Sequence, residues 1–223
     1  MEGVIFDFNG TLIFDDEINM QSWKEFARKK YNYPMTTEEY YHLNGTPGET
    51  WINYLTKGTL SPQEETEHTF EKEATYREMI MNSNLKLAKG VIPLFEKLKE
   101  AKIPFTIATS SCKDNVDTFF KKFELSKWFD YNKVVYFNGQ FNGKPAPDIY
   151  IIAAKNIGVD VKKCVIFEDT KSGVKAGYSA GAKVIGVASS KKPEEVWKFE
   201  KVEDVIQDYT GITVEKLKKL FEK

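Results

Sequence analysis

Short apolar runs alternate along the chain with longer stretches of helical periodicity. The runs are rich in β-branched and aromatic residues, and they lie at Val4–Phe6, Ile103–Ala108, Val134–Phe137, Cys164–Phe167 and Val184–Val187. Runs this short and this uniformly apolar predict strands that are buried on both faces. Their alternation with helices predicts an α/β fold built on a doubly wound parallel sheet, with ligands at the C-terminal ends of the strands.

Helical periodicity is clearest in the second half of the chain. Between residues 90 and 101 apolar side chains recur at three- and four-residue spacing, and the same spacing recurs between residues 149 and 157. The segment that starts at Val214 predicts a closing amphipathic helix. These helices supply the layers that a parallel sheet needs on its two faces.

About ninety residues separate the first predicted strand from the second, which is too many for one crossover helix. Thr36–Glu39 and Ser61–Glu64 read as capping boxes, and both predict helix starts. We therefore expect a helical domain over residues 15–82, inserted into a core domain of residues 1–14 and 83–223. Apolar positions recur every four residues at Thr66, Phe70 and Ala74, and they predict packing within a helix bundle.

Composition narrows the possible partners. The 223 residues include 32 basic and 33 acidic side chains, so no excess of positive charge is available to neutralise nucleic-acid phosphates. The longest apolar run, Ile149–Ala154, is too short to span a membrane, and the N-terminus lacks the pattern of a signal peptide. Cys112 and Cys164 are far apart in sequence and form no metal-binding pair. We expect a cytoplasmic protein, monomeric, with neither nucleic acid nor membrane as a partner.

Four motifs carry the candidate chemistry, and they occur in a fixed order. The first strand runs into Asp7-Phe8-Asn9-Gly10-Thr11, and the second into Thr109-Ser110-Ser111. Further on, Gly143-Lys144-Pro145 precedes a helix, and Glu168-Asp169 ends a later strand. Because parallel strands present their carboxyl ends at one sheet edge, these motifs are expected to meet there.

With these motifs the sequence resembles the haloacid dehalogenase-like hydrolase superfamily. The resemblance covers the whole chain and is closest to the branch with a helical cap that contains β-phosphoglucomutase and many small-molecule phosphatases. It implies a Rossmann-like core, an inserted α-helical cap and phosphatase activity on a small phosphorylated metabolite such as a sugar phosphate, with Mg²⁺ as the cofactor. The cap would swing about linkers near Phe14–Glu17 and Asn82–Lys89.

The resemblance also implies a role for each motif. Asp7 would be the nucleophile that forms an aspartyl-phosphate, and Lys144 would offset the charge of Asp7 and of the phosphate. The metal ligands would be Asp7, the backbone carbonyl of Asn9, Asp169 and Glu168, the last directly or through water. The residues that bind substrate or phosphate would be Gly10, Thr109, Ser110, Trp23 and Gly45. The alternative role for Trp23 is packing within the helix bundle. Gly45 belongs to a cap loop that is expected to shape substrate specificity.

Asn9 departs from the family pattern, which has an aspartate acid–base at this position. An amide keeps the backbone carbonyl but cannot relay a proton, so we expect slow hydrolysis of alkyl phosphates and faster hydrolysis of aryl or acyl phosphates. Asn19 and Gly48 replace a histidine and an arginine of the mutases. Lys72 keeps the spacing to Tyr76 that mutase relatives show, so a phosphate grip is its alternative role, but a solvated helix face is expected. A phosphomutase or phosphotransferase, and a weakened relative that only binds a metabolite or a protein, remain as alternatives.

Overall fold

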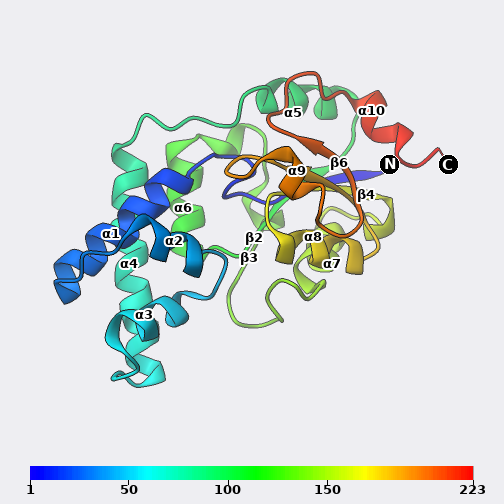
Figure 1. The fold of residues 1–223 in the computed structure, drawn as a ribbon. Coiled ribbons are helices and arrows are strands. Elements are labelled where there is room, and N and C mark those ends of the chain that lie inside the picture. The colour runs from blue at the N-terminus through cyan, green and yellow to red at the C-terminus, as the bar shows by residue number, and fades with distance from the viewer. Residues whose placement is uncertain (223) are drawn as a thin grey trace. The chain divides into compact units, whose positions relative to one another are not determined.

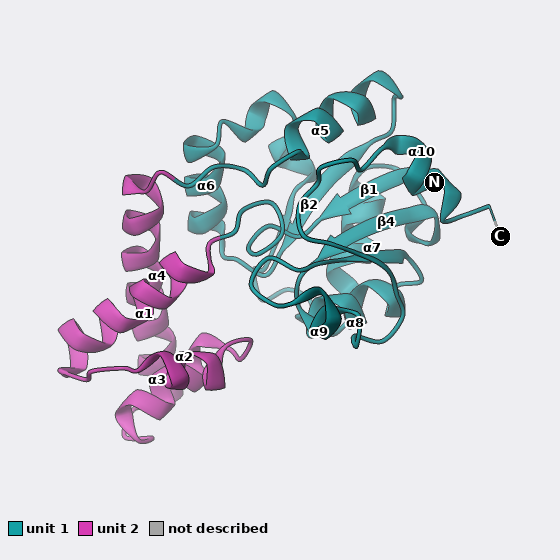
Figure 2. Cartoon of the chain, turned by 45° about the horizontal axis from the view of Figure 1, so that its top comes forward, with its two compact units in different colours: residues 1–14, 85–223 teal, residues 15–84 magenta. Residues whose placement is uncertain are grey.

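The computed structural model describes residues 1–222, which form two compact units (Figure 2). The core unit comprises Met1–Phe14 and Leu85–Lys223, and the helical unit comprises Asp15–Asn84. The second junction therefore falls between residues 84 and 85, slightly later than the junction between 82 and 83 that the sequence suggests. The first junction falls between residues 14 and 15 in both.

A parallel sheet of six strands runs through the described part of the core unit, in the order β3-β2-β1-β4-β5-β6 (Figure 1). The strands are β1 Gly3–Phe6, β2 Phe105–Thr109, β3 Val135–Tyr136, β4 Cys164–Glu168, β5 Lys183–Val187 and β6 Val202–Ile206. This order confirms the doubly wound α/β fold. Only β6 was missing from the sequence prediction, because its sequence VEDVI carries two acidic residues and it pairs with the sheet on one side alone.

The helices of the core unit are α5 Val91–Glu100, α6 Lys113–Lys122, α7 Asp148–Asn156, α8 Lys171–Ser179, α9 Pro193–Val196 and α10 Val214–Lys219. Of these, α5, α7 and α10 lie where the periodicity predicts helices. Three short 3₁₀ turns lie between the core-unit helices, η1 Leu125–Lys127, η2 Tyr131–Lys133 and η3 Val161–Lys163. Among residues 1–222, no helix is both long enough and apolar enough to cross a bilayer.

Side chains on successive residues of β1 point into opposite layers of the core, because successive side chains of a strand face opposite sides of the sheet. Ile5 lies in a cluster with residues of α7 and α8. Phe6 points to the other layer, where its ring stacks on Phe167 at a centroid distance of 5.2 Å and meets the edge of Phe95 at 5.4 Å. Because both layers hold fully buried side chains, the central strands are held rigidly in place. The residues directly after these strands, such as Asp7 and Asp169, are therefore also held in defined positions.

Four helices make up the helical unit: α1 Asp16–Tyr31, α2 Thr37–Leu43, α3 Gly48–Thr56 and α4 Pro62–Asn82. Both predicted capping boxes are confirmed, at Thr36 for α2 and at Ser61 for α4. The unit has its own apolar cluster, in which the rings of Trp23 and Trp51 stack at 4.4 Å.

The buried face of α4 differs from the predicted one. Phe70 is 57% exposed, whereas Lys72, Tyr76 and Ile80 are buried. The predicted stripe, which contains Phe70, and the observed stripe, which contains Lys72, are offset by two residues. Two residues correspond to about 200° around a helix, so the two stripes lie on nearly opposite faces. The expectation that Phe70 packs in the bundle is therefore wrong, and so is the expectation that Lys72 is solvated.

Candidate active site

The strand register brings the first and last motifs to the same edge of the sheet. Phe6 pairs with Phe167, so Asp7 lies level with Glu168 at the ends of β1 and β4. The backbone N–H of Asp7 donates to the carbonyl of Phe167 at 3.0 Å and extends this pairing by one bond. Asp7 is 6% exposed, which places its carboxylate in a largely desolvated position.

Lys144 reaches this edge from the segment between β3 and α7. Its Nζ donates to Oδ1 of Asp7 at 2.6 Å and also to Oε1 of Glu168, and its side chain is 6% exposed. Burial alone lowers the pKa of Lys144, but the negative charges of Asp7 and Glu168 outweigh it and hold that pKa above its ordinary value. The ammonium is therefore charged at any physiological pH and bridges two carboxylates.

Glu168 is surrounded by hydrogen-bond donors. Its Oε1 accepts from Lys144 and from the Tyr150 hydroxyl at 2.8 Å, and its Oε2 accepts from the Thr170 N–H at 2.9 Å and from the Thr170 hydroxyl at 3.0 Å. Burial raises the pKa of Glu168, but Lys144 and these bonds lower it below its usual value. Four donors are about as many as an ionised carboxylate accepts, so direct contact with a metal would break one of these bonds. In this arrangement Glu168 chiefly orients Lys144.

Asp169 lies against the turn that follows β1. A Cβ added to Gly10, which has φ +70°, would come within 2.2 Å of the Oδ2 atom of Asp169. The Thr11 hydroxyl donates to Oδ1 of the same carboxylate at 3.3 Å. Burial, followed by the charges of Glu168 and Asp7, raises the pKa of Asp169 well above its ordinary value. The positive charges of Lys191 and Lys144 lower this pKa, but they offset the rise only in part.

These carboxylates fit a divalent cation. One oxygen from each of Asp7, Glu168 and Asp169 lies within 4.8 Å of the others. Because Gly10 has no Cβ, the Asp169 carboxylate can lie against the turn after β1, and burial together with the charges of Glu168 and Asp7 raises the pKa of Asp169. Hard oxygen donors that keep room for water are the ligands Mg²⁺ prefers.

The second motif follows β2 at the same edge. Thr109 is 2% exposed, and its hydroxyl oxygen accepts a hydrogen bond from the Ser111 N–H at 3.1 Å. The Ser111 hydroxyl donates to Oδ1 of Asn9 at 2.8 Å and so links the first two motifs. Ser110, which lies between Thr109 and Ser111 in the sequence, is exposed. Ser111 was not singled out from the sequence, although it lies within the motif.

The two predicted substrate residues of the helical unit differ in their surroundings. Trp23 is 4% exposed, within the apolar cluster, so the packing alternative describes its observed contacts. Gly45 is exposed, in the loop between α2 and α3, with φ +91° and open space around it. Buried Lys72 donates to Oδ1 of Asn19 at 2.7 Å and lies 4.7 Å from the centroid of the Trp23 ring.

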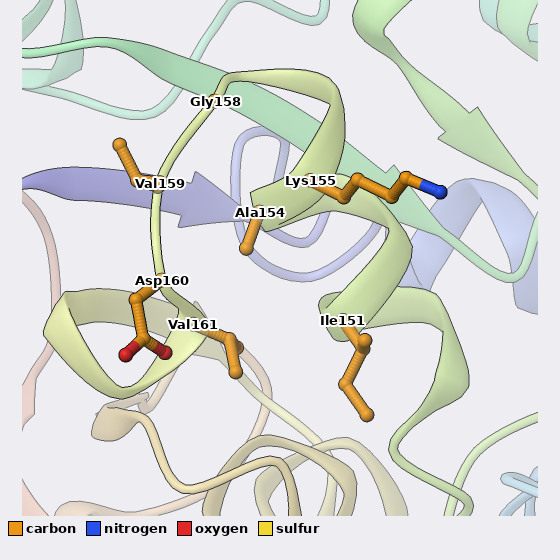
Figure 3. A pocket seen from close by; sticks show the side chains of 7 residues that line it. All are labelled: Ile151, Ala154, Lys155, Gly158, Val159, Asp160 and Val161. Atoms are coloured by element: carbon orange, nitrogen blue, oxygen red, sulfur yellow. The ribbon is translucent and has the colours of Figure 1, made fainter.

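A cavity of about 410 Å³ lies between α7 and η3. Figure 3 shows the side chains that line it, which include Lys155 and Asp160. Its last lining residue, Val161, belongs to the turn that leads into β4, whereas Glu168 ends that strand. The strand β4 between these two positions has five residues and is about 16 Å long. This cavity therefore lies at the opposite edge of the sheet from the carboxylates.

Comparison with known proteins agrees with this geometry. Residues 4–187 match the family model described as haloacid dehalogenase-like hydrolase. A crystal structure of a HAD hydrolase, family IA, variant 3, from Entamoeba histolytica shares 42% identity over 100% of both chains, with a TM-score of 0.97. The phosphorylated carbohydrates phosphatase of Thermotoga maritima is 30% identical over 85% of this chain and 87% of its own length.

A β-phosphoglucomutase from Clostridium difficile has the same fold, with a TM-score of 0.81 at 23% identity, over 100% of this chain and 97% of its own. The family match covers the strands β1, β2, β3, β4 and β5 and all four motifs. On this evidence the chain belongs to the haloacid dehalogenase-like hydrolase family.

Proposed function

We propose that the chain is a Mg²⁺-dependent phosphatase that acts on a small phosphorylated metabolite, with sugar phosphates as the first candidates. The observation that carries this proposal is the contact of 2.6 Å between Lys144 Nζ and Oδ1 of Asp7. A carboxylate can approach a phosphate dianion only where positive charge offsets their repulsion, and the buried ammonium supplies it. The phosphatase from Thermotoga maritima, named for phosphorylated carbohydrates, supports the choice of substrate class.

In the first step, a carboxylate oxygen of Asp7 forms a bond to phosphorus while the bond from phosphorus to the substrate's leaving oxygen breaks. The leaving oxygen departs with the bonding electrons and takes a proton from water, because the Asn9 amide has no acidic proton to give. Lys144 stays beside the transferring group and offsets its charge, and the Thr109 hydroxyl is a candidate donor to it. The product of this step is an aspartyl-phosphate on Asp7.

In the second step, a water oxygen bonds to the same phosphorus and the bond to the Asp7 oxygen breaks. Inorganic phosphate leaves, and the Asp7 carboxylate is restored. The proton of the attacking water passes to solvent, because no base occupies position 9 to take it, so this step is also slower than in relatives with aspartate there. The contact of Asn9 with Ser111 at 2.8 Å holds the amide in place without changing its chemistry.

Asp7, Asp169 and the backbone carbonyl of Asn9 would hold the Mg²⁺, with Glu168 in its surroundings. When bound, the ion supplies positive charge and a template for the phosphate oxygens. We also assign Asp15–Asn84 as the cap domain of the enzyme, with the loop around Gly45 as the part that selects the substrate.

Asn9 favours one second candidate, a phosphotransferase. An aspartyl-phosphate that water attacks slowly can instead pass its phosphoryl group to the hydroxyl of another acceptor. In that reaction the acceptor oxygen bonds to phosphorus, the Asp7–phosphorus bond breaks, and the acceptor proton goes to solvent. The Asn9 side chain, which cannot act as a base, is the specific observation behind this candidate.

One assay separates the candidates. The purified chain is incubated with p-nitrophenyl phosphate and Mg²⁺ or with EDTA, and both released nitrophenol and inorganic phosphate are measured. Steady release of both products that stops in EDTA supports the phosphatase, and a single stoichiometric burst of nitrophenol supports the phosphotransferase. Asp7→Asn should abolish either signal. Asp160→Asn, at the opposite end of the sheet, is the matched control and should keep it. Silence of the wild type in every condition would overturn both candidates.

A further inference from the structure

We propose that Tyr209 positions the metal-binding carboxylate Asp169, acting through the backbone and side chain of Thr11. This inference rests on the Mg²⁺ site of the proposed function. Tyr209 lies after the last residue of the family match, which ends at residue 187, so no family motif assigns it a role. It is a positioning residue, because its hydroxyl donates to Thr11 and not to the carboxylate.

Two hydrogen bonds connect Tyr209 to Asp169. The Tyr209 hydroxyl donates to the backbone carbonyl of Thr11 at 3.3 Å. The Thr11 hydroxyl in turn donates to Oδ1 of Asp169 at 3.3 Å. Tyr209 is 1% exposed and Thr11 is fully buried, so water does not compete for either bond. The chain of bonds therefore holds the turn after β1 against the carboxylate.

The ring of Tyr209 packs against the same strands that carry the site. This ring lies 5.1 Å from the ring of Phe167 and 6.1 Å from the ring of Phe6, the residues that directly precede Glu168 and Asp7. Burial and the nearby charges of Asp7 and Asp169 hold the pKa of Tyr209 well above its ordinary value. The hydroxyl therefore stays protonated and remains a donor.

The backbone of Tyr209 is fixed independently of its hydroxyl. The Tyr209 N–H donates to the carbonyl of Lys89 at 2.9 Å, and the Ala88 N–H donates to the carbonyl of Leu12 at 2.8 Å. Gly90 approaches so closely that an added Cβ would lie 2.6 Å from the Tyr209 carbonyl carbon. Because these contacts and the ring packing remain when the hydroxyl is removed, Tyr209→Phe should fold and lose only the link to Thr11.

Loss of this link should weaken Mg²⁺ binding. Partners that orient a metal ligand without touching the metal typically contribute about 10- to 100-fold in affinity, and Tyr209 acts one bond further away. We expect Tyr209→Phe to raise the dissociation constant for Mg²⁺ about 3- to 10-fold. Thr11→Val removes the last bond and should have an equal or larger effect, whereas Thr11→Ser keeps the hydroxyl and should bind as the wild type does.

The test is calorimetric titration of Mg²⁺ into the protein without substrate, well below the unfolding temperature. The double variant Tyr209→Phe/Thr11→Val should bind no more weakly than Thr11→Val alone, because the phenol holds the Thr11 backbone and the Thr11 hydroxyl is the last link to Asp169. Tyr40→Phe is the matched control: this tyrosine is also fully buried, its hydroxyl donates to Asp16 in the helical unit, and its loss should leave Mg²⁺ affinity unchanged.

The outcomes distinguish this inference from the proposed function. A wild type that binds no Mg²⁺ would overturn the metal site itself. A wild type that binds Mg²⁺ together with a Tyr209→Phe variant of equal affinity would overturn the positioning role alone. Additive losses in the double variant would also overturn it, because they would mean that Tyr209 and Thr11 act separately. Thermal unfolding of each variant checks that the titrated proteins are folded.

Discussion

The ammonium of Lys144 lies 2.6 Å from Oδ1 of Asp7 and contacts Glu168 at the same time, so one cation bridges two buried carboxylates. Asp169 adds a third carboxylate to the group. The whole chain is nearly neutral, with 32 basic and 33 acidic residues, yet three carboxylates and one lysine leave this site locally negative. An incoming phosphate adds more negative charge, and a divalent cation is the simplest compensation.

Replacing Lys144 should damage both activity and stability. Lys144→Met removes the charge that offsets the transferring phosphoryl group, and we expect turnover to fall by about 10²–10³-fold. It also leaves Asp7 and Glu168 without their buried partner, which typically costs about 3–5 kcal/mol in the free energy of unfolding. Phosphate release and urea unfolding measure the two effects. Lys155→Met, at an exposed position on α7, is the control and should change neither. Wild-type turnover in Lys144→Met would contradict the assigned role.

Gly10→Ala should weaken metal binding by a steric route. The new Cβ would lie 2.2 Å from Oδ2 of Asp169, and φ +70° adds a strain of about 1–2 kcal/mol for an L-residue. Gly139→Ala is the matched control, because Gly139 has φ +77° and nothing within 4 Å of the added Cβ. Both variants should lose stability, but only Gly10→Ala should require more Mg²⁺ for half-maximal activity. An equal Mg²⁺ requirement in the two variants would show that the contact with Asp169 is unimportant.

Asn9→Asp should raise the turnover of alkyl phosphates. An aspartate would keep the acceptor for the Ser111 hydroxyl, now 2.8 Å from Oδ1 of Asn9, and would add a group that can give and take a proton. We expect an increase of about 10²–10⁴-fold with a sugar phosphate. The increase should be much smaller with p-nitrophenyl phosphate, whose leaving group needs no proton. Equal rates for wild type and variant on the sugar phosphate would refute the idea that position 9 limits the reaction.

Much of the core unit was predictable, because its strands are short, apolar and bounded by recognisable turns. The strand β6 was not, because two of its five residues are acidic and only β5 pairs with it. The sequence pattern places Phe70 and Lys72 on the wrong faces of α4. Two sets of positions with the same four-residue spacing interleave along this helix, and one contains Phe70 while the other contains Lys72. The choice between such stripes depends on which neighbouring helices pack against them, and periodicity does not contain that information.

The motif residues could be predicted because each directly ends a strand or precedes a helix, where chain position determines spatial position. Tyr150 and Thr170, which donate to Glu168, were not identified. Thr170 also caps α8 through its contact with the Gly173 N–H, and this capping position is a signal that the sequence does offer. Tyr150 and Tyr209 reach the site from positions without any local signal, because their roles come from tertiary packing alone.

The helical unit should show a pH dependence that a single carboxylate controls. Glu39 accepts hydrogen bonds from Thr36, in the capping box of α2, and from the hydroxyls of Tyr33 and Tyr54. Contact with Tyr33, followed by Thr36 and Tyr54, lowers the pKa of Glu39 from 4.5 to about 2. A carboxyl group whose pKa is lower in the folded state stabilises that state above its unfolded pKa, and this contribution is lost as the pH falls toward the folded value.

Glu39→Gln tests this dependence, because it keeps the shape of the side chain and removes its charge. At pH 7 the variant should be less stable by about 1 kcal/mol, the usual contribution of such a cap. The difference between wild type and variant should stay constant above about pH 5.5 and shrink between pH 4.5 and pH 2, as the wild-type carboxylate is protonated. Thermal unfolding across this range measures the difference. Glu38→Gln, an exposed neighbour in the same first turn, is the control and should lose less stability at pH 7 than Glu39→Gln, and a difference between wild type and Glu39→Gln that grows on acidification would contradict the lowered pKa.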